Sequence, residues 1–367
     1  MSEDIARKLS LLLADDIEGV VDALRIDVRQ RGRRQLVCFA PWNSHHKPKL
    51  EINLHRRRGG WNDWHGGVWG DALGLVACTL SRQPDPKAAD ALREAIRWAQ
   101  ARYGIAGAVE PEAWKEKVAA AEKRAKVREG QAARELAEAR KQMFGVWLRF
   151  SDPLRPTTRT HKGCFGARYL EARGVDFGLL PHLPRAVRLS GSQQWRGRDG
   201  ETHVGPALMS AMTLPDGKFG SLHRIWIDPF RDGEKADINP PRKMYPSSEG
   251  AAIRLWRGAS RLSMAEAAEK GIKEGVVVAE GVEDGLSVAM MTPELRVDAA
   301  GSLPGLLSYV PPPCASHLVI AADNDWGKPQ AQALLDRAVA RLRTEFKMPV
   351  GIARSPEGKD FNDLVKE

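Results

Sequence analysis

Cysteine is scarce in this sequence, and its spacing excludes one class of small fold. Only four cysteines occur in 367 residues, and no two of them form a Cys-x-x-Cys pair. Such wide spacing is unlike the disulfide framework of a small secreted domain and fits a reducing compartment. We therefore expect a cytoplasmic protein without structural disulfides. The four positions are Cys38, Cys78, Cys164 and Cys314.

Long apolar runs are also missing from the sequence. No run approaches the roughly 20 residues that a membrane-spanning helix needs. The opening stretch, MSEDIARKLS, is charged and has a helical pattern, unlike a secretory signal. We therefore expect no membrane partner.

Positive charge, by contrast, is in excess. The chain carries 56 Lys and Arg against 47 Asp and Glu, which gives a formal net charge of +9. A basic balance favours a polyanionic partner, because Lys and Arg neutralise phosphates and release their counterions. A merely soluble basic protein is the alternative that charge alone leaves open.

The patterns along the chain predict four parts in an α/β (α+β overall) protein. Residues 1–105 combine helical periodicity with short strands and read as a small domain. Residues 106–144 read as a helical linker, because the sequence from Glu110 to about Phe144 is rich in Ala, Glu, Lys, Arg and Gln and predicts a long solvated helix. DNA contact along this helix is the minority interpretation. Residues 145–268 are mixed and include a hairpin around PDGK. Residues 269–367 alternate apolar strands with helices, which predicts a parallel sheet flanked by helices.

Acidic residues follow three successive strands of this last part. Glu280 follows VVVA, Asp323 and Asp325 follow LVIAA, and Asp360 comes after the final strand. Ligands of open parallel sheets bind outside the carboxyl ends of the strands, and residues i and i+2 of an extended segment point the same way. Carboxylate oxygens suit Mg²⁺ or Mn²⁺. A single acid here is more often a helix cap, but three such sites in one domain favour a metal-binding function.

These acids lie in segments that resemble a known family. EGVEDGLSV, AADNDWG and GKDFNDLV resemble, in this order, the three acidic motifs of the Toprim domain. Together with GARYLEARGV, LHRIWIDPF and PPRKMYPSSEGAAIRL they are similar to Toprim-domain primases of plasmids and phages, over about residues 145–367. The resemblance implies metal-dependent synthesis of short RNA primers on single-stranded DNA, from nucleoside triphosphates, for plasmid or phage replication.

The resemblance also implies roles for individual residues. Glu280 would act near the reacting phosphate as acid–base catalyst or metal ligand. Asp323, Asp325 and Asp360 would complete the set that holds Mg²⁺ or Mn²⁺. Cations nearby would bind the triphosphate and the template backbone, although surface ion pairing explains any one of them about as well. These cations are Arg224, Arg242, Lys243 and Lys359, with Arg254 and Arg257 in the same segments.

Two other functions compete with priming. A Toprim nuclease would cut DNA with the same metals, and a non-catalytic accessory protein would keep the fold as a DNA-binding scaffold. The basic segment 223–257 favours a primase over a nuclease, because a nuclease needs no triphosphate pocket. No GxxxxGK[ST] motif occurs, so we expect any helicase partner to be a separate protein.

The N-terminal part resembles the zinc-binding module with which such primases usually begin, but its ligands are missing. APWNSHHKPKLEINL followed by WNDWHGGVWGDALGLVA matches that module in frame. A structural zinc site needs four thiolate or imidazole ligands, and the matching residues supply none, so we expect a zinc-ribbon-like domain without zinc. The matching positions hold Ala40, Asn43, Trp64 and Gly67. A rearranged site is the minority alternative, and it would use Cys38, His45, His46 and His65.

The same domain interleaves arginines with tryptophans, a combination that suits single-stranded nucleic acid because bases stack on aromatic rings. The alternative is that the tryptophans form the domain's core, which we expect for Trp42 and Trp69. The arginines are Arg31, Arg33, Arg34, Arg56, Arg57 and Arg58, and the tryptophans are Trp42, Trp61, Trp64 and Trp69.

Overall fold

The computed structural model divides the chain into two compact units, residues 1–135 and 136–367. A 38-residue helix, α5 (Glu112–Arg149), belongs in part to each, so the predicted long helix is confirmed. The expectation that it is solvated is wrong for its first half, where Trp114, Val118 and Ala121 pack in the core of the first unit. The four-part division remains a prediction. The structure describes residues 3–44, 46–55, 59–65, 67–105, 112–156, 164–180, 182–197, 200–325 and 327–365.

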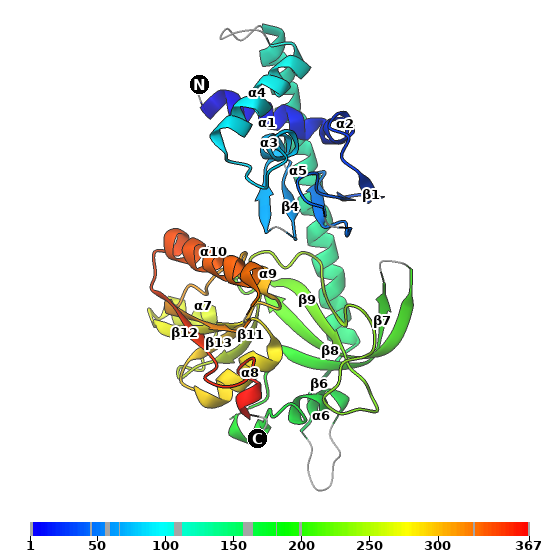
Figure 1. The fold of residues 1–367 in the computed structure, drawn as a ribbon. Helices are drawn as coiled ribbons and strands as arrows, with labels where there is room; N and C mark the ends of the chain where they lie inside the picture. The colour runs from blue at the N-terminus through cyan, green and yellow to red at the C-terminus, as the bar shows by residue number, and fades with distance from the viewer. Residues whose placement is uncertain are drawn as a thin grey trace. The chain divides into compact units, whose positions relative to one another are not determined.

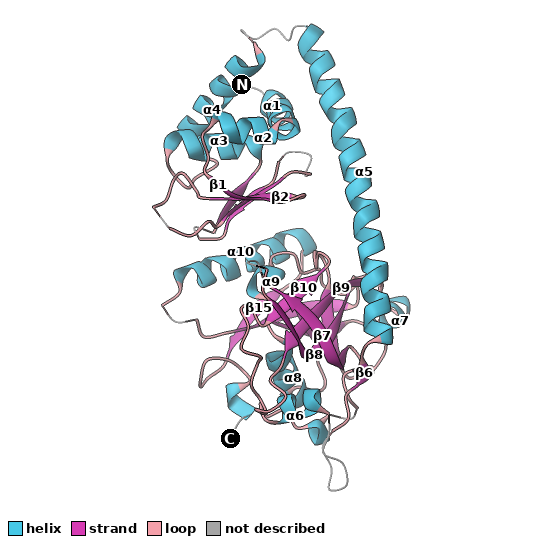
Figure 2. Cartoon of the chain, turned by 90° about the vertical axis from the view of Figure 1, so that its right-hand side faces the viewer, coloured by secondary structure: helices cyan, strands magenta, loops and turns pink. Residues whose placement is uncertain are grey.

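The first unit packs helices against a five-stranded antiparallel sheet in the order β1-β2-β3-β4-β5 (Figure 2). The N-terminal helical stretch is divided in two, because α1 ends at Asp15 and α2 begins at Ile17. The strands are β1 (Val28–Arg31), β2 (Gln35–Cys38), β3 (Leu50–Asn53), β4 (Trp61–Asp63) and β5 (Val68–Gly70). The helices are α1 (Glu3–Asp15), α2 (Ile17–Ala23), α3 (Ala72–Ser81) and α4 (Ala89–Tyr103).

In this unit the buried Asp63 joins the two loops that resemble a zinc module. Its Oδ2 accepts hydrogen bonds from Trp42 Nε1 at 2.9 Å and Asn43 Nδ2 at 3.1 Å, and its Oδ1 accepts from His65 N at 3.0 Å. The rings of Trp42 and Trp61 pack at 5.2 Å between centroids. Hydrogen bonds and aromatic packing thus connect the loops directly.

The tryptophans divide differently from our expectation. Trp42 and Trp61 belong to the core, with 9% and 2% of their surface exposed, whereas Trp64 and Trp69 are 43% and 52% exposed. The core interpretation is therefore right for Trp42 and wrong for Trp69. Trp69 lies on the short strand β5, whose residues are all exposed or half-buried. His45 and the three arginines 56–58 lie outside the described residues.

The second unit is built on one ten-stranded mixed sheet (Figure 1). Its main path runs β10-β9-β8-β11-β13-β12-β14-β15, and β7 extends it by pairing with β8 and β6. Strands β13, β12, β14 and β15 are parallel, as the alternating pattern predicts. The strands are β6 (Asp152–Pro153), β7 (Val187–Arg196), β8 (Thr202–Thr213), β9 (Phe219–Trp226), β10 (Arg242–Tyr245), β11 (Ala252–Arg257), β12 (Glu274–Ala279), β13 (Arg296–Ala299), β14 (Ala315–Ala322) and β15 (Val350–Arg354).

Helices cover both faces of the parallel part, as Figure 1 shows. On one face, Val282 and Leu286 of α8 pack with Val277 and Val297. On the other face, α9 and α10 pack on Val276, Val278 and Ile320. The α/β fold class is confirmed. The helices are α6 (Phe165–Glu171), α7 (Met264–Glu269), α8 (Val282–Met291), α9 (Leu303–Leu306) and α10 (Pro329–Phe346), with short 3₁₀ turns at Phe177–Leu179 and Asp363–Val365.

The sheet joins the residues 145–268 and 269–367 that we treated as separate parts. Strand β11 pairs with β8 on one side and with β13 on the other. Within the described residues, no helix is long and apolar enough to cross a membrane.

Candidate active site

Three of the predicted acids gather where the parallel strands end. Glu280 directly follows β12 and Asp323 directly follows β14, and the last paired residues of these strands, Ala279 and Ala321, are opposite each other. Glu280, Asp323 and Asp325 line one small hollow of about 20 Å³. Their side chains are only 17%, 15% and 19% exposed. They lie together because the parallel strands that precede them end at the same edge of the sheet.

Burial and mutual repulsion raise the pKa values of carboxyl groups in this cluster. Burial raises the pKa of Glu280, and the neighbouring carboxylates Asp323 and Asp325 raise it further. Burial also raises the pKa of Asp323, with Asp360 and Asp325 acting in the same direction. Desolvated like charges favour a proton or a cation, so the cluster is suited to bind positive charge.

Each acid already faces one basic side chain. Arg242 Nη2 lies 3.7 Å from Glu280 Oε1, and Lys359 Nζ lies 3.5 Å from Asp323 Oδ2. Lys328 Nζ lies 2.6 Å from Asp325 Oδ1, a pair that the sequence did not single out. The structure thus brings two of the predicted phosphate-binding cations, Arg242 and Lys359, to the acids.

Asn324, between the two aspartates, fixes the loop that carries them. Its Nδ2 donates to the carbonyl oxygens of Ser355 at 2.9 Å and Gly358 at 3.0 Å, and its N–H donates to Lys359 O at 2.6 Å. The side chain is buried on the side opposite to the hollow, as alternation in an extended segment requires. Asp360 follows Lys359 directly, so this lock also holds Asp360 near Asp323.

Asp284, in the first turn of α8, is a member of the cluster that our sequence reasoning missed. Burial, then the charges of Asp360 and Asp323, raise its pKa to about 8. Its buried Oδ1 has no hydrogen-bond partner among the described residues. The signal was present in EGVED, because Glu280 and Asp284 are four residues apart and α8 begins between them.

An ion pair and a hydrogen bond hold Glu283, which lies in the first turn of α8. Burial opposes the charge of Glu283, but Lys235 Nζ at 3.2 Å and the Tyr169 hydroxyl at 2.7 Å lower its pKa to about 2. This carboxylate is therefore ionised and compensated, in contrast to the neighbouring Asp284. The network positions α8, and its carboxylate and Tyr169 are buried while Lys235 is partly exposed.

Arg224 and Lys243 lie on the other face of their strands from Arg242. They are direct cross-strand partners on β9 and β10, so they point to the same side of the sheet, opposite to the side on which Arg242 meets Glu280. Arg224 lies 5.0 Å from the Trp226 ring and Lys243 lies 4.5 Å from the Trp195 ring. The structure does not bring this pair to the carboxylates.

Arg254 and Arg257 lie away from the acids as well. Arg254 is partly buried, with 13% of its side chain exposed, and pairs with Asp298. Arg257 is opposite Arg296 at the start of β13, the end of the strand remote from the cluster. His223, at the start of the basic segment 223–257, is buried, and neither ring nitrogen has a partner in the described part of the chain. Burial lowers its pKa to about 4.

The acidic side chains at this edge offer only carboxylate oxygens as metal ligands, and such oxygens are the ligands that a hard divalent cation prefers. The orphaned Oδ1 of Asp284 supports the same fit. Across the residues that the structure describes, however, no three His, Cys, Asp or Glu side chains are placed to hold one ion together. Each acid is turned instead toward its own basic neighbour.

Comparisons with known families agree with this geometry. Residues 275–367 match the family model of the Toprim domain. The C-terminal part of the chain is a Toprim domain. Residues 154–255, immediately before it, match a domain of unknown function, DUF7146. The Toprim match contains all five acids of the cluster. No curated protein matches the sequence.

Several solved primase structures resemble the chain at low similarity. The zinc-binding and RNA polymerase domains of Aquifex aeolicus primase are 15% identical, and the match covers 100% of this chain and 82% of that one at a TM-score of 0.34. The primase fragment of the bacteriophage T7 primase-helicase protein is 18% identical, with 55% and 72% covered and a TM-score of 0.32. The E. coli primase catalytic core is 12% identical, with 55% and 68% covered and a TM-score of 0.34. At these TM-scores the likeness supports no conclusion about activity.

Proposed function

We propose that this protein is a primase, a metal-dependent nucleotidyltransferase that makes short RNA primers on single-stranded DNA. The observation that carries the proposal is the meeting of Glu280, Asp323 and Asp325 at one edge of a Toprim domain, next to Arg242. Desolvated carboxylates with adjacent cations are suited to bind a nucleoside triphosphate together with its metal ion. The supporting sequence feature is the basic segment 223–257, which a nuclease does not need.

In this proposal Glu280, Asp323, Asp325 and Asp360 would hold a divalent cation, Mg²⁺ or Mn²⁺, with Asp284 beside them. When bound, it neutralises phosphate charge and stabilises the attacking and leaving oxygens of phosphoryl transfer. The side chains must first turn away from Arg242, Lys328 and Lys359. Those three cations are then released to the incoming phosphates.

The remaining residues position and balance the charges. The Arg242 side chain is 47% exposed, so it can leave Glu280 and contact a triphosphate, and Lys359, 58% exposed, can do the same. The hydrogen bonds of Asn324 to Ser355 and Gly358 keep Asp323 and Asp325 facing the hollow while these cations move. Arg224 and Lys243, which we predicted for the same task, would reach nucleic acid only from the other face of the sheet.

We further infer the partners from this assignment. The template is single-stranded DNA, the substrates are nucleoside triphosphates, and the replicon is a plasmid or phage. A separate replicative helicase would supply unwinding in the cytoplasm. The excess of 56 basic over 47 acidic residues supports a polyanionic template.

One assay tests the proposal against its competitors. The protein is incubated with single-stranded DNA, Mg²⁺ or Mn²⁺ and labelled ribonucleoside triphosphates, and the products are separated by size. We expect short template-dependent RNA that disappears when the metal is chelated. Shortened DNA would indicate the Toprim nuclease instead, and intact DNA without new products would indicate a non-catalytic accessory protein.

A further inference from the structure

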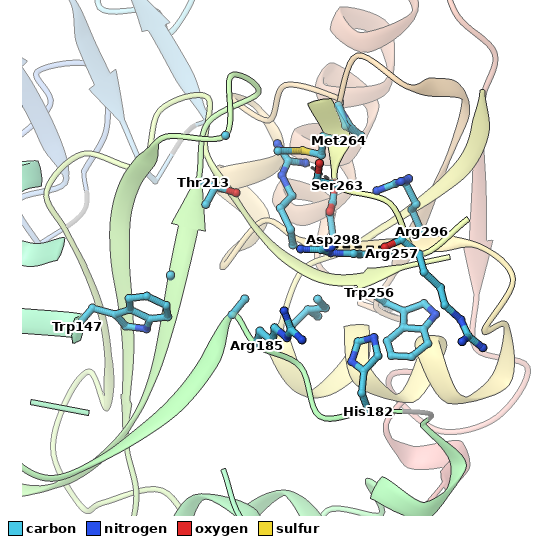
Figure 3. Close-up of a pocket in the computed structure, with 17 residues that line it drawn as sticks. Trp147, His182, Arg185, Thr213, Trp256, Arg257, Ser263, Met264, Arg296 and Asp298 are labelled. Carbon is cyan, nitrogen blue, oxygen red and sulfur yellow. Dashed lines mark hydrogen bonds and ion pairs between the residues drawn. The ribbon is translucent and has the colours of Figure 1, made fainter. Parts of the chain in front are cut away.

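A large cavity lies in the second unit, where the sheet splits between β8 and β11. Its volume is about 480 Å³, within the range of small-ligand sites. The two strands pair only near Ala252 and Ile253, and beyond these residues they separate. Side chains from α5, β8, β11 and β13 surround the opening, with Trp147 on one side and Trp256 beside His182 on the other (Figure 3).

Three residues that line this cavity each carry an enclosed polar atom without a hydrogen-bond partner among the described residues. These atoms are Trp147 Nε1, Thr213 Oγ1 and Arg254 Nε. An unsatisfied buried donor costs about 1–3 kcal/mol, so an occupant toward which these side chains shift slightly would gain by supplying the missing partners. Two are obligate N–H donors, and the hydroxyl can donate as well. The occupant must therefore present hydrogen-bond acceptors.

The charges around the cavity are positive. Five arginines line it, and two of them are compensated, because Arg254 pairs with Asp298 and Arg296 pairs with Glu274. Arg185 and Arg261 have no carboxylate partner in the part of the chain that the structure describes. Arg257 donates to the Arg261 carbonyl oxygen at 3.4 Å, and its charge contributes to lowering the pKa of Glu266. Guanidinium groups and N–H donors together match phosphate oxygens.

The geometry points to a second nucleotide site: we propose that this cavity binds the phosphate groups of a free nucleotide. Among described residues, the cavity shares no lining residue with the hollow of Glu280, Asp323 and Asp325. It also lies toward the opposite end of β13, because Arg257 is opposite Arg296 there. The site is therefore independent of the acidic cluster and does not rest on the proposed polymerase activity.

A nucleic-acid strand fits the cavity less well than a free nucleotide. Strand-binding grooves offer aromatic faces on which successive bases stack. Here the Trp147 ring is stacked with Phe144 at 6.1 Å and carries Arg188 at 5.0 Å, and Trp256 is packed against His182 at 4.6 Å. The available groups are N–H donors and guanidiniums, which recognise the phosphate end.

Calorimetric titration of the full-length protein tests the proposal, with ATP and inorganic tripolyphosphate as probes. The buffer contains EDTA, so the acidic cluster has no metal through which to hold phosphate. We expect one site per chain for both probes, and we expect it to persist in Glu280→Gln. Absence of metal-independent binding would overturn the proposal, as would binding that Glu280→Gln removes.

Two variants assign the binding to the cavity. Arg185→Gln combined with Arg261→Gln removes two exposed guanidiniums, and we expect affinity for both probes to fall by about tenfold or more. The matched control is Arg93→Gln with Arg97→Gln on α4, which removes the same charge outside the cavity and should leave affinity unchanged. Equal losses in both double variants would show that net charge, and not the cavity, is responsible.

Thr213→Val gives an independent check that is nearly isosteric. Because the Thr213 hydroxyl has no partner within the described residues, we expect the unliganded protein to melt at the same temperature or higher, while ATP affinity falls several-fold. A single-stranded oligonucleotide without terminal phosphates serves as competitor. If it displaces tripolyphosphate, the cavity is a strand site and the proposal is wrong.

Discussion

Glu280, Asp323 and Asp325 are the side chains on which the proposed chemistry depends most directly. We predict that Glu280→Gln, or Asp323→Asn with Asp325→Asn, lowers primer synthesis by about a hundredfold or more. Affinity for single-stranded DNA should change little, because it comes mainly from cations elsewhere. Primer yield and DNA affinity are measured on the same preparations.

The control for these variants is Glu269→Gln, an exposed glutamate at the end of α7. It removes one negative charge outside the cluster and should leave synthesis intact. Full activity in either cluster variant would contradict the assignment of the acids. A loss of DNA binding in parallel with synthesis would contradict their purely catalytic role.

His223 predicts a pH dependence of stability. Its folded-state pKa of about 4 lies below the ordinary value of 6.5, because burial disfavours the charged ring. The unfolded chain therefore takes up a proton between about pH 6.5 and 4 that the folded chain does not. The stability contribution is complete above pH 6.5 and is lost as the pH falls, by an amount on the order of 3 kcal/mol.

The measurement is the free energy of unfolding by urea at pH 7 and pH 4.5, for the natural protein and His223→Leu. Leucine has a similar volume and no ring nitrogen to leave without a partner. We expect the decrease between the two pH values to be smaller in the variant. An identical decrease in both proteins would mean that other groups control the acid sensitivity.

Asp63 connects the loops of the β3–β5 region through hydrogen bonds, and we expect these bonds to do the work of a structural metal, which predicts two outcomes. Purified protein should carry no stoichiometric zinc by elemental analysis, and EDTA should not lower its melting temperature. Burial raises the pKa of the Cys38 thiol to about 12, which also disfavours a thiolate ligand. One tightly held zinc ion per chain would refute this prediction.

Asp63→Ala should destabilise the same region. The substitution leaves the buried Trp42 Nε1 donor without its partner and removes the bond to His65 N. We expect a loss of about 2 kcal/mol or more in the free energy of unfolding. Asp90→Ala, at an exposed position on α4, is the control and should change stability by less than about 0.5 kcal/mol.

The arrangement of the strands explains how much of the site could be predicted from sequence. The edge position of Glu280, Asp323 and Asp325 follows from apolar strands and from the rule that parallel strands end together. The positions of Arg224 and Lys243 depend on the β9–β10 register, which the sequence does not reveal. Arg254 is partly buried because Asp298, 44 residues later, lies opposite it, and only the folded sheet brings the two together.

For the molecule as a whole, the first unit is expected to contribute binding to single strands. Trp64 and Trp69 are the exposed tryptophans there, and Arg31, Arg33 and Arg34 are engaged with Glu18, Asp22 and Glu135. We predict that Trp64→Ala with Trp69→Ala weakens binding to single-stranded DNA by about 1–3 kcal/mol per stacked base. Fluorescence anisotropy with a labelled oligonucleotide measures the change.

Deleting residues 1–105 extends the same test to the charges. The truncated protein should bind more weakly and lose less affinity as salt increases, because fewer phosphates are neutralised. Circular dichroism checks that the remaining chain is folded. If the affinity and its salt dependence are both unchanged, the first unit has no role in binding.

The ion pair and hydrogen bond of Glu283 limit where this protein can be cut into fragments that still fold. Glu283 belongs to the Toprim match, whereas its partners Lys235 and Tyr169 belong to the preceding match of residues 154–255. Strand β11 crosses the same boundary by pairing with β13. A fragment cut between the two matches would therefore keep an uncompensated buried carboxylate and an open strand edge. We therefore expect the two matched regions to unfold together as one unit.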